Sequence, residues 1–294
     1  MERRAFGSTG LQVSMLGLGA DHIGDPTASE GEVARLLGTA LDSGLNVIDT
    51  ARGYLRSEDR IGRLISHRRD EFVLSTKVGY EIPGVPDWSG AAVTRGIDRA
   101  LAQLRTDVLD VCFLHSCALD VLAAGEAVAA LHAAQQAGKV RVCGYSGEAE
   151  ALAWAIESGA FGAIQTSVNL ADQWTLSDLL PRATEVGRLG VIAKRPLANA
   201  AWRFADRPVG DYAEPYWERL QAMAITPEDG DWTATALRFS TFTPGVSTAI
   251  VGTSSVAHLQ AAVQAVALGP LPPGEVARWG AAYQPFMGRW LPQI

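Results

Sequence analysis

Four ionisable side chains lie at or just beyond the ends of apolar runs, where they could move a proton. Asp49 ends the run LNVID, Lys77 is the penultimate residue of FVLSTKV, and His115 ends VLDVCFLH. Tyr54 follows Asp49 by five residues. A tyrosine becomes a useful general acid near neutral pH when an ammonium group lowers its pKa of about 10, and a carboxylate can hold that ammonium group in place. These residue types indicate proton delivery to an oxygen atom that gains negative charge.

Each of these side chains also has a structural explanation. An Asp at a strand end often caps the next helix, and a Lys or Tyr there can place an apolar stem inside and a polar tip in water. The neighbouring Ser57 and Glu58 are expected to be the cap and first turn of a helix. The combination of Asp, Tyr, Lys and His at strand ends favours a functional site over four independent structural roles.

The elements that would position these residues are repeated along the chain. Eight β-branched apolar runs alternate with Ala- and Leu-rich segments of helical period, which predicts a βα repeat and a parallel sheet. The predicted strands are 13–20, 45–50, 72–78, 108–116, 140–146, 163–168, 190–195 and 247–252. Eight such units predict a (β/α)₈ barrel, with a doubly wound open sheet as the alternative. In a barrel the carboxyl ends of the strands meet on one face and carry the site.

One predicted helix shows the pattern clearly. Ser29 and Glu32 have the spacing of a capping box, Gly44 is a stop signal, and one helical face between them is apolar. That face consists of Val33, Leu36, Leu37, Ala40 and Leu41. Turn residues in AFGSTGLQVS predict an N-terminal β-hairpin. The longer stretches 78–90, 195–232 and 270–294 are expected to form long loops at the carboxyl face, within a single domain spanning 1–294.

Composition restricts the class of partner. The 294 residues carry a formal net charge of −7 and no block of Lys or Arg, which argues against nucleic acid or an anionic membrane surface. No apolar run approaches the roughly 18 residues of a membrane span, and MERRAFGSTG lacks the apolar run of a signal peptide, so a cytoplasmic location is expected. Cys112, Cys117 and Cys143 show no metal-ligand spacing and are expected to be reduced, with Cys117 also considered as an oxidisable thiol near the rim.

Three stretches, DTARGYLRSE, LSTKVG and LDVCFLHS, resemble the aldo-keto reductases, and the resemblance runs from RAFGSTGLQVSMLGLGA to AIVGTSSVAHL. It places the catalytic tetrad of that family on Asp49, Tyr54, Lys77 and His115. The implied activity is NAD(P)H-dependent reduction of an aldehyde or ketone, with Tyr54 donating the proton, Lys77 lowering its pKa while paired with Asp49, and His115 orienting the carbonyl. Leu55 stands where the family usually has glycine.

The resemblance also implies a cofactor site. Ser146 and Gln165 would bind the nicotinamide carboxamide, and Lys194 and Arg195, which replace an aromatic residue and a serine, would contact the phosphates. The segment GTSSVAHLQAA would hold the adenosine end at a helix N-terminus, and NADPH is expected, with NADH as the alternative. The full expected cofactor set is Ala20, Asp21, Asp49, Ser146, Gln165, Lys194, Arg195, Leu197, Gly252, Thr253, Ser254 and His258.

The substrate is expected to be a small carbonyl compound, and no metal is predicted. The expected substrate-binding set is His22, Tyr54, Trp88, His115, Trp202 and Phe204, because Trp and Phe suit the wall of an apolar cleft. Two other functions are considered: a regulatory module that keeps the barrel and cofactor with little turnover, and a Schiff-base aldolase-type barrel with Lys77 as the nucleophile.

Overall fold

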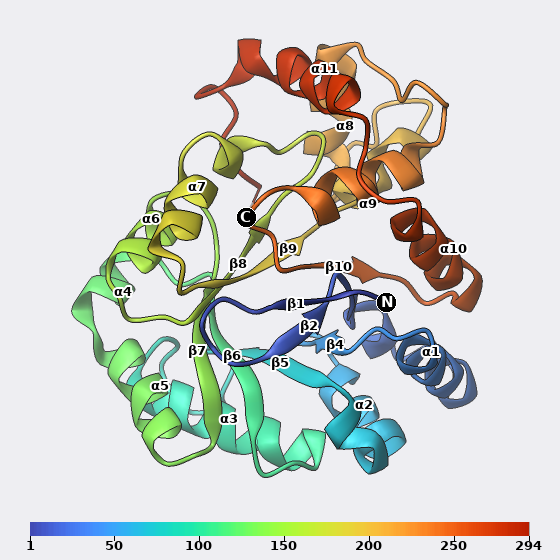
Figure 1. Cartoon of the computed structure of the whole chain (residues 1–294). Helices are drawn as coiled ribbons and strands as arrows, with labels where there is room; N and C mark the ends of the chain where they lie inside the picture. Colours follow the sequence, from blue (N-terminus) through green and yellow to red (C-terminus); the bar gives the residue numbers. More distant parts are fainter. Residues whose placement is uncertain (294) are drawn as a thin grey trace.

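Eight parallel strands close into a barrel in the computed structural model, which describes residues 1–293 (Figure 1). Each strand pairs with the next in chain order, and the last pairs with the first, so the predicted (β/α)₈ fold is confirmed and the open-sheet alternative is wrong. All eight predicted runs form barrel strands. These are β3 (Leu16–Gly19), β4 (Val47–Asp49), β5 (Val73–Val78), β6 (Leu109–His115), β7 (Val140–Ser146), β8 (Ala163–Ser167), β9 (Gly190–Lys194) and β10 (Thr248–Gly252).

Helices surround the barrel, and α8 and α11 lie together beyond the ring at the top of Figure 1. None of the helices within residues 1–293 is long and apolar enough to cross a membrane. The α-helices are α1 (Glu30–Asp42), α2 (Ser57–Ile65), α3 (Gly90–Leu104), α4 (Leu119–Ala124), α5 (Glu126–Gln136), α6 (Ala149–Glu157), α7 (Leu179–Val186), α8 (Glu214–Met223), α9 (Trp232–Phe242), α10 (Val256–Ala267) and α11 (Pro273–Tyr283). Short 3₁₀ turns are η1 (His22–Gly24), η2 (Ser66–Glu71), η3 (Trp174–Leu176), η4 (Ala198–Arg203) and η5 (Gln284–Phe286).

Helix α1 confirms the local rules that predicted it. The Ser29 hydroxyl accepts a hydrogen bond from the Glu32 backbone N–H and donates to the Glu32 carboxylate, so Ser29 and Glu32 cap the helix at the predicted spacing. The buried face is the predicted apolar one. Gly44 follows the helix with a φ of +84°, a left-handed conformation that glycine adopts without strain.

The N-terminal hairpin closes the amino end of the barrel. Its strands β1 (Arg3–Ala5) and β2 (Gln12–Ser14) pair antiparallel, as predicted. Phe6 enters the barrel and packs with apolar side chains that include Val111 and Ile192. Gly190 makes this possible, because a Cβ atom there would lie 2.5 Å from the Phe6 ring. The barrel interior is therefore a packed core below the strand ends that carry the polar residues.

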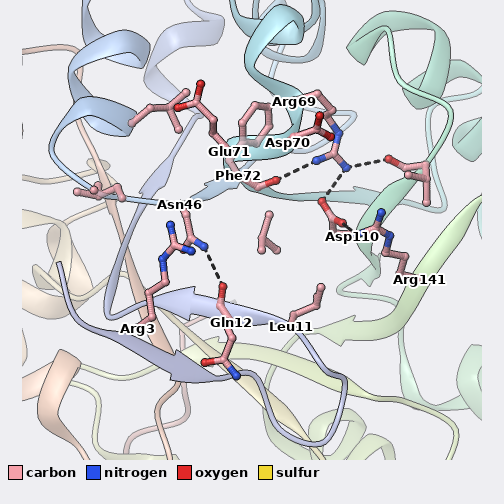
Figure 2. A pocket seen from close by; sticks show the side chains of 15 residues that line it. Arg3, Leu11, Gln12, Asn46, Arg69, Asp70, Glu71, Phe72, Asp110 and Arg141 are labelled. Atoms are coloured by element: carbon pink, nitrogen blue, oxygen red, sulfur yellow. Dashed lines mark hydrogen bonds and ion pairs between the residues drawn. The ribbon is translucent and has the colours of Figure 1, made fainter.

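A cavity of about 420 Å³ lies between this hairpin and the amino ends of the strands (Figure 2). Four of its polar side chains take part in hydrogen bonds or ion pairs that cross it. Arg69 donates to the Asp110 carboxylate over 2.6 Å and to two backbone carbonyls, Arg141 lies 2.9 Å from the same carboxylate, and Asn46 donates to the Gln12 carbonyl. These contacts describe a structural joint that holds the base of the barrel.

Replacing Asp110 by Asn should lower the free energy of unfolding by about 2–4 kcal/mol, because a nearly buried carboxylate that pairs with two arginines loses its charge. Urea denaturation measures this change. Asp98→Asn is the matched control, since the Asp98 and Lys139 side chains are 52% and 40% exposed and the loss should stay below about 1 kcal/mol. Equal effects of the two substitutions would contradict a structural role for Asp110.

Candidate active site

The carboxyl ends of the barrel strands surround a second cavity, of about 650 Å³. Every barrel strand contributes at least one lining residue, and further walls come from the loops after β3, β4, β6 and β9. The lining from the strand ends and from the loop after β4 is Gly19, Asp49, Tyr54, Lys77, His115, Ser146, Gln165, Lys194, Ile250, Val251 and Gly252. The four side chains predicted to move a proton therefore border one cavity.

The floor of this cavity contains a buried ion pair. The Lys77 ammonium donates to Asp49 Oδ2 over 2.6 Å and to the Thr50 carbonyl over 2.9 Å, and the two charged side chains are only 2% and 1% exposed. Burial lowers the Lys77 pKa, but the charge of Asp49 and the neighbouring Tyr54 raise it by more, so the net direction is upward. Lys77 is a cation at neutral pH.

Tyr54 lies against this ion pair. Its hydroxyl accepts a hydrogen bond from Lys77 Nζ over 3.3 Å, and Nζ lies 4.8 Å from the centre of its ring. Burial raises the pKa of Tyr54, Lys77 lowers it and Asp49 raises it again, with a net rise. Lys77 therefore acts on this pKa in the predicted direction, but burial outweighs it in the cofactor-free protein. The phenol keeps its proton.

The backbone around Tyr54 is tightly constrained. Leu55 is 71% exposed and has a φ of +47°, a left-handed conformation that costs a leucine roughly 1–2 kcal/mol. Gly24 of η1 approaches the Tyr54 carbonyl so closely that a Cβ atom would lie 2.1 Å from the oxygen. Helix α2 starts at Ser57, and Arg56 is in the cap position, so the prediction that Ser57 is the cap is wrong. The Ser57 hydroxyl donates to the Ala20 carbonyl instead of capping the helix.

His115 borders the same cavity and faces Tyr54 edge-on, with 6.3 Å between ring centres. Burial, followed by the charges of Lys77, Lys194 and Arg195, lowers the pKa of His115 to about 2. The imidazole is therefore neutral in the physiological range. One ring nitrogen, Nδ1, is 2.6 Å from the Tyr80 hydroxyl. Tyr80 was not among the predicted site residues, although it lies three residues after Lys77.

Ser146 of β7 and Gln165 of β8 extend the hydrogen-bond network of the ion pair. They are directly paired in the register of β7 and β8, and the Ser146 hydroxyl donates to Gln165 Oε1 over 2.8 Å. The Gln165 amide then donates to Asp49 Oδ1 over 3.1 Å. Both side chains are fully buried at the cavity wall, where a hydroxyl and an amide could bind a carboxamide group.

Lys194 and Arg195 share one buried carboxylate, Glu148, which the sequence analysis missed. Lys194 Nζ is 3.3 Å and Arg195 Nη1 is 3.8 Å from Glu148 Oε1. Glu148 also accepts hydrogen bonds from Ser167 and Thr166, so it is well satisfied in the core. Burial lowers the Lys194 pKa and the charge of Glu148 raises it, with a net fall.

The remaining residues of the expected cofactor set divide into two groups. Asp21, Leu197 and Gly252 line the cavity with those already described. The others lie beside it: Ala20 is fully buried, Thr253 is mostly buried and its hydroxyl accepts from the Ser255 N–H, and Ser254 and His258 are exposed near the N-terminus of α10.

Three of the six residues expected to bind substrate do not line the cavity. His22, Tyr54 and His115 do, whereas three aromatic residues pack elsewhere. The Trp88 ring lies 5.6 Å from that of Tyr80, Trp202 stacks on Trp232 at 5.4 Å, and Phe204 packs in the apolar cluster near α8 and α11. These large rings bury more surface against other apolar groups than at the cavity mouth. The loop after β9 lines the cavity instead, through Asn199, Ala200, Arg203, Asp211, Tyr212 and Ala213.

Cys117 is buried, with 1% of its surface exposed. Burial raises the pKa of its thiol to about 12, and the thiolate is the form that reacts with oxidants. Cys112 and Cys143 are also buried free thiols. The structure therefore favours the structural explanation of Cys117 over an oxidisable rim thiol.

Comparison with known proteins identifies the family of the chain. A model of the aldo/keto reductase family matches residues 15–284. The chain belongs to the aldo-keto reductase family. L-galactose dehydrogenase of Arabidopsis thaliana is 29% identical over 285 residues, covering 90% of this chain and 88% of that protein. The holo form of an aldo-keto reductase from Bacillus halodurans superposes with a TM-score of 0.84 at 26% identity, covering 96% of each chain.

These relatives confirm the predicted family and class of reaction. Another relative, the 6-dehydroglucose reductase of Novosphingobium aromaticivorans, is 32% identical over 155 residues, which cover 49% of this chain and 50% of that protein. The chain is an oxidoreductase of a family that uses nicotinamide cofactors, and the comparisons support NAD(P)H-dependent carbonyl reduction. They do not favour the regulatory module or the Schiff-base aldolase.

The phenol of Tyr54 should ionise only above about pH 10 in the cofactor-free aldo-keto reductase, because burial outweighs the field of Lys77. The measurement is the tyrosinate absorbance of the wild type minus that of Tyr54→Phe during a pH titration. Lys77→Met should move the Tyr54 transition to still higher pH. A Tyr54 transition below pH 9 would show that the lysine dominates.

Proposed function

We propose that this aldo-keto reductase reduces an aldehyde or ketone to an alcohol, with Tyr54 as the general acid. The observation that carries the proposal is the contact of the Tyr54 hydroxyl with the buried Lys77 and Asp49 pair, with His115 beside it in one cavity. The carbonyl oxygen of a substrate gains negative charge during reduction, and these groups are suited to receive that charge.

The residues have separate roles in the proposed reaction. A nicotinamide cofactor supplies the hydride when bound. Tyr54 gives its proton to the substrate oxygen, and the ammonium of Lys77 stabilises the phenolate that remains, because the two atoms are already 3.3 Å apart. Asp49 fixes Lys77 in place. Neutral His115 donates a hydrogen bond that orients the carbonyl.

The side chains of the cavity fit a dinucleotide by their chemistry. Ser146 and Gln165 provide a hydroxyl and an amide for a carboxamide, and Lys194 and Arg195 provide cations for phosphates. Thr253 and Ser254 immediately precede the N-cap residue of α10. The N-terminus of this helix favours an anion such as a 2'-phosphate. We propose NADPH as the cofactor, with NADH as the alternative, and include Ala20, Asp21, Leu197, Gly252 and His258 in its surroundings.

A small polar carbonyl compound suits the substrate side of the cavity. Trp88, Trp202 and Phe204 are absent from the lining of the described cavity. His22, Asn199, Arg203 and Asp211 contribute polar groups there. The names of two relatives, L-galactose dehydrogenase and 6-dehydroglucose reductase, refer to sugars. We include in the proposal a hydroxylated aldehyde or ketone as the substrate class. We further propose a single domain acting in the cytoplasm, without a macromolecular partner in the reaction.

Tyr54→Phe should lower kcat for carbonyl reduction by about 10²–10⁴-fold, the usual contribution of a general acid, while NADPH binding is retained. Consumption of the reduced cofactor with a panel of aldoses, ketoses and simple aldehydes measures the turnover. Tyr283→Phe is a suitable control, because Tyr283 is fully buried outside the lining of the cavity. Near-normal turnover by Tyr54→Phe would exclude the proposed acid.

Cofactor choice can be measured independently of turnover. Quenching of protein fluorescence should show tighter binding of NADPH than of NADH, and Ser254→Ala should weaken NADPH by about tenfold or more, as expected for a hydrogen bond to a charged group. Binding of NADH is the internal control, since it has no 2'-phosphate. Tighter binding of NADH by the wild type, or equal weakening of both cofactors by Ser254→Ala, would contradict the assignment.

A further inference from the structure

Tyr80 makes a close contact with His115 from the loop after β5. The Tyr80 hydroxyl is 2.6 Å from His115 Nδ1, and the two ring centres are 5.4 Å apart. Within residues 1–293, neither of these two side chains makes another hydrogen bond. His115 also borders the cavity, whereas Tyr80 does not belong to its lining. Tyr80 therefore reaches the site only through His115.

The loop holds Tyr80 in this position at the expense of backbone strain. Gly79, with a φ of +128°, has no room for a side chain, because a Cβ atom would lie 2.2 Å from the Trp88 ring. Trp88 has a φ of +63°, packs on the Tyr80 ring at 5.6 Å and donates its backbone N–H to the Gly79 carbonyl. On the other side, a Cβ atom at Gly53 would lie 2.8 Å from the Tyr80 hydroxyl. Trp88 thus fixes Tyr80 and does not line the cavity.

The direction of the hydrogen bond follows from counting protons and acceptors. Burial raises the pKa of Tyr80 to about 12, so the hydroxyl keeps its proton. Among the described residues, His115 Nδ1 is the acceptor available to that proton. If the hydroxyl donates to Nδ1, the proton of the neutral imidazole must be on Nε2. The opposite tautomer would leave the tyrosine proton without an acceptor in this part of the chain.

We propose that Tyr80 is a positioning residue that fixes His115 as the Nε2–H tautomer, so that the imidazole can only donate to the substrate oxygen. The inference rests on the proposed carbonyl reduction. It has a second consequence for Tyr54, whose ring faces that of His115. An unprotonated Nε2 would compete with the substrate for the Tyr54 proton, whereas Nε2–H leaves the substrate oxygen as the acceptor for both groups.

The test replaces Tyr80 by Phe, which keeps the ring and removes the hydroxyl. In the wild type, ¹H–¹⁵N NMR of the histidine side chains should show His115 as the Nε2–H form, and His115→Asn identifies its signals. In Tyr80→Phe the two tautomers should be mixed. We expect kcat/KM for carbonyl reduction to fall about 10–100-fold, as is typical when the partner that orients a histidine is removed, while NADPH affinity is unchanged.

A double mutant separates this role from a general structural one. Tyr80→Phe should have almost no further effect on kcat/KM in the His115→Asn background, because Tyr80 acts through His115. Tyr283→Phe, which removes another tyrosine hydroxyl, should leave the tautomer and the rate unchanged. The Nδ1–H form in the wild type, or an equal loss of rate from Tyr80→Phe with and without His115, would overturn the inference. If no carbonyl compound is turned over by the wild type, the proposed function fails, and the NMR result still decides the tautomer.

Discussion

The buried ion pair between Lys77 and Asp49 is the interaction on which the rest of the site depends. An unpaired ammonium at this depth would lose its proton or destabilise the fold, so the adjacent strand must provide a carboxylate at the right level. The register of β4 and β5 places Asp49 opposite Ser75, and the Ser75 hydroxyl donates to the same carboxylate. Gln165, from across the barrel, donates a further hydrogen bond to this carboxylate. The pair is thus satisfied by groups from three strands, and Lys77 also donates to the Tyr54 hydroxyl at the cavity.

On the other side of the barrel, a second buried carboxylate pairs with buried cations in the same way. Glu148 lies at the start of α6 and compensates the cations that end β9 and begin its loop. Arg195 in turn donates to Ser167 and to the hydroxyl of Tyr212, so the loop after β9 is tied to the same charges. Lys194 and Arg195, like Lys77, lie close enough to His115 to lower its pKa, so charges from both sides of the barrel act on one imidazole. Burial and these charges together keep that imidazole neutral.

The sequence was sufficient for the features that depend on periodicity and strand ends. Apolar runs predicted all eight strands, and parallel strands bring Asp49, Lys77 and His115 to one face whatever the details of their loops. Tyr80 and Glu148 were missed because their roles depend on loop backbones and on distant partners. Trp88, Trp202 and Phe204 were misplaced for a related reason: tertiary packing decides whether a loop aromatic faces a cavity or another ring. The Tyr54 pKa depends on depth of burial, which spacing along a chain does not contain.

Backbone strain is concentrated in the loops that meet these charges. Of the eleven non-glycine residues with positive φ in the described chain, nine follow the carboxyl ends of barrel strands, among them Leu55, Trp88 and Arg195. Such conformations persist only where surrounding contacts over-determine them, and here those contacts include the Tyr80 ring for Trp88 and Ser167 for Arg195. Relaxing these loops would be expected to stabilise the backbone while loosening Tyr54, Tyr80 and the cations. The rigid ion pair at the floor and the strained loops above it are therefore parts of one arrangement, in which the barrel fixes the charges and the loops fix the proton donors.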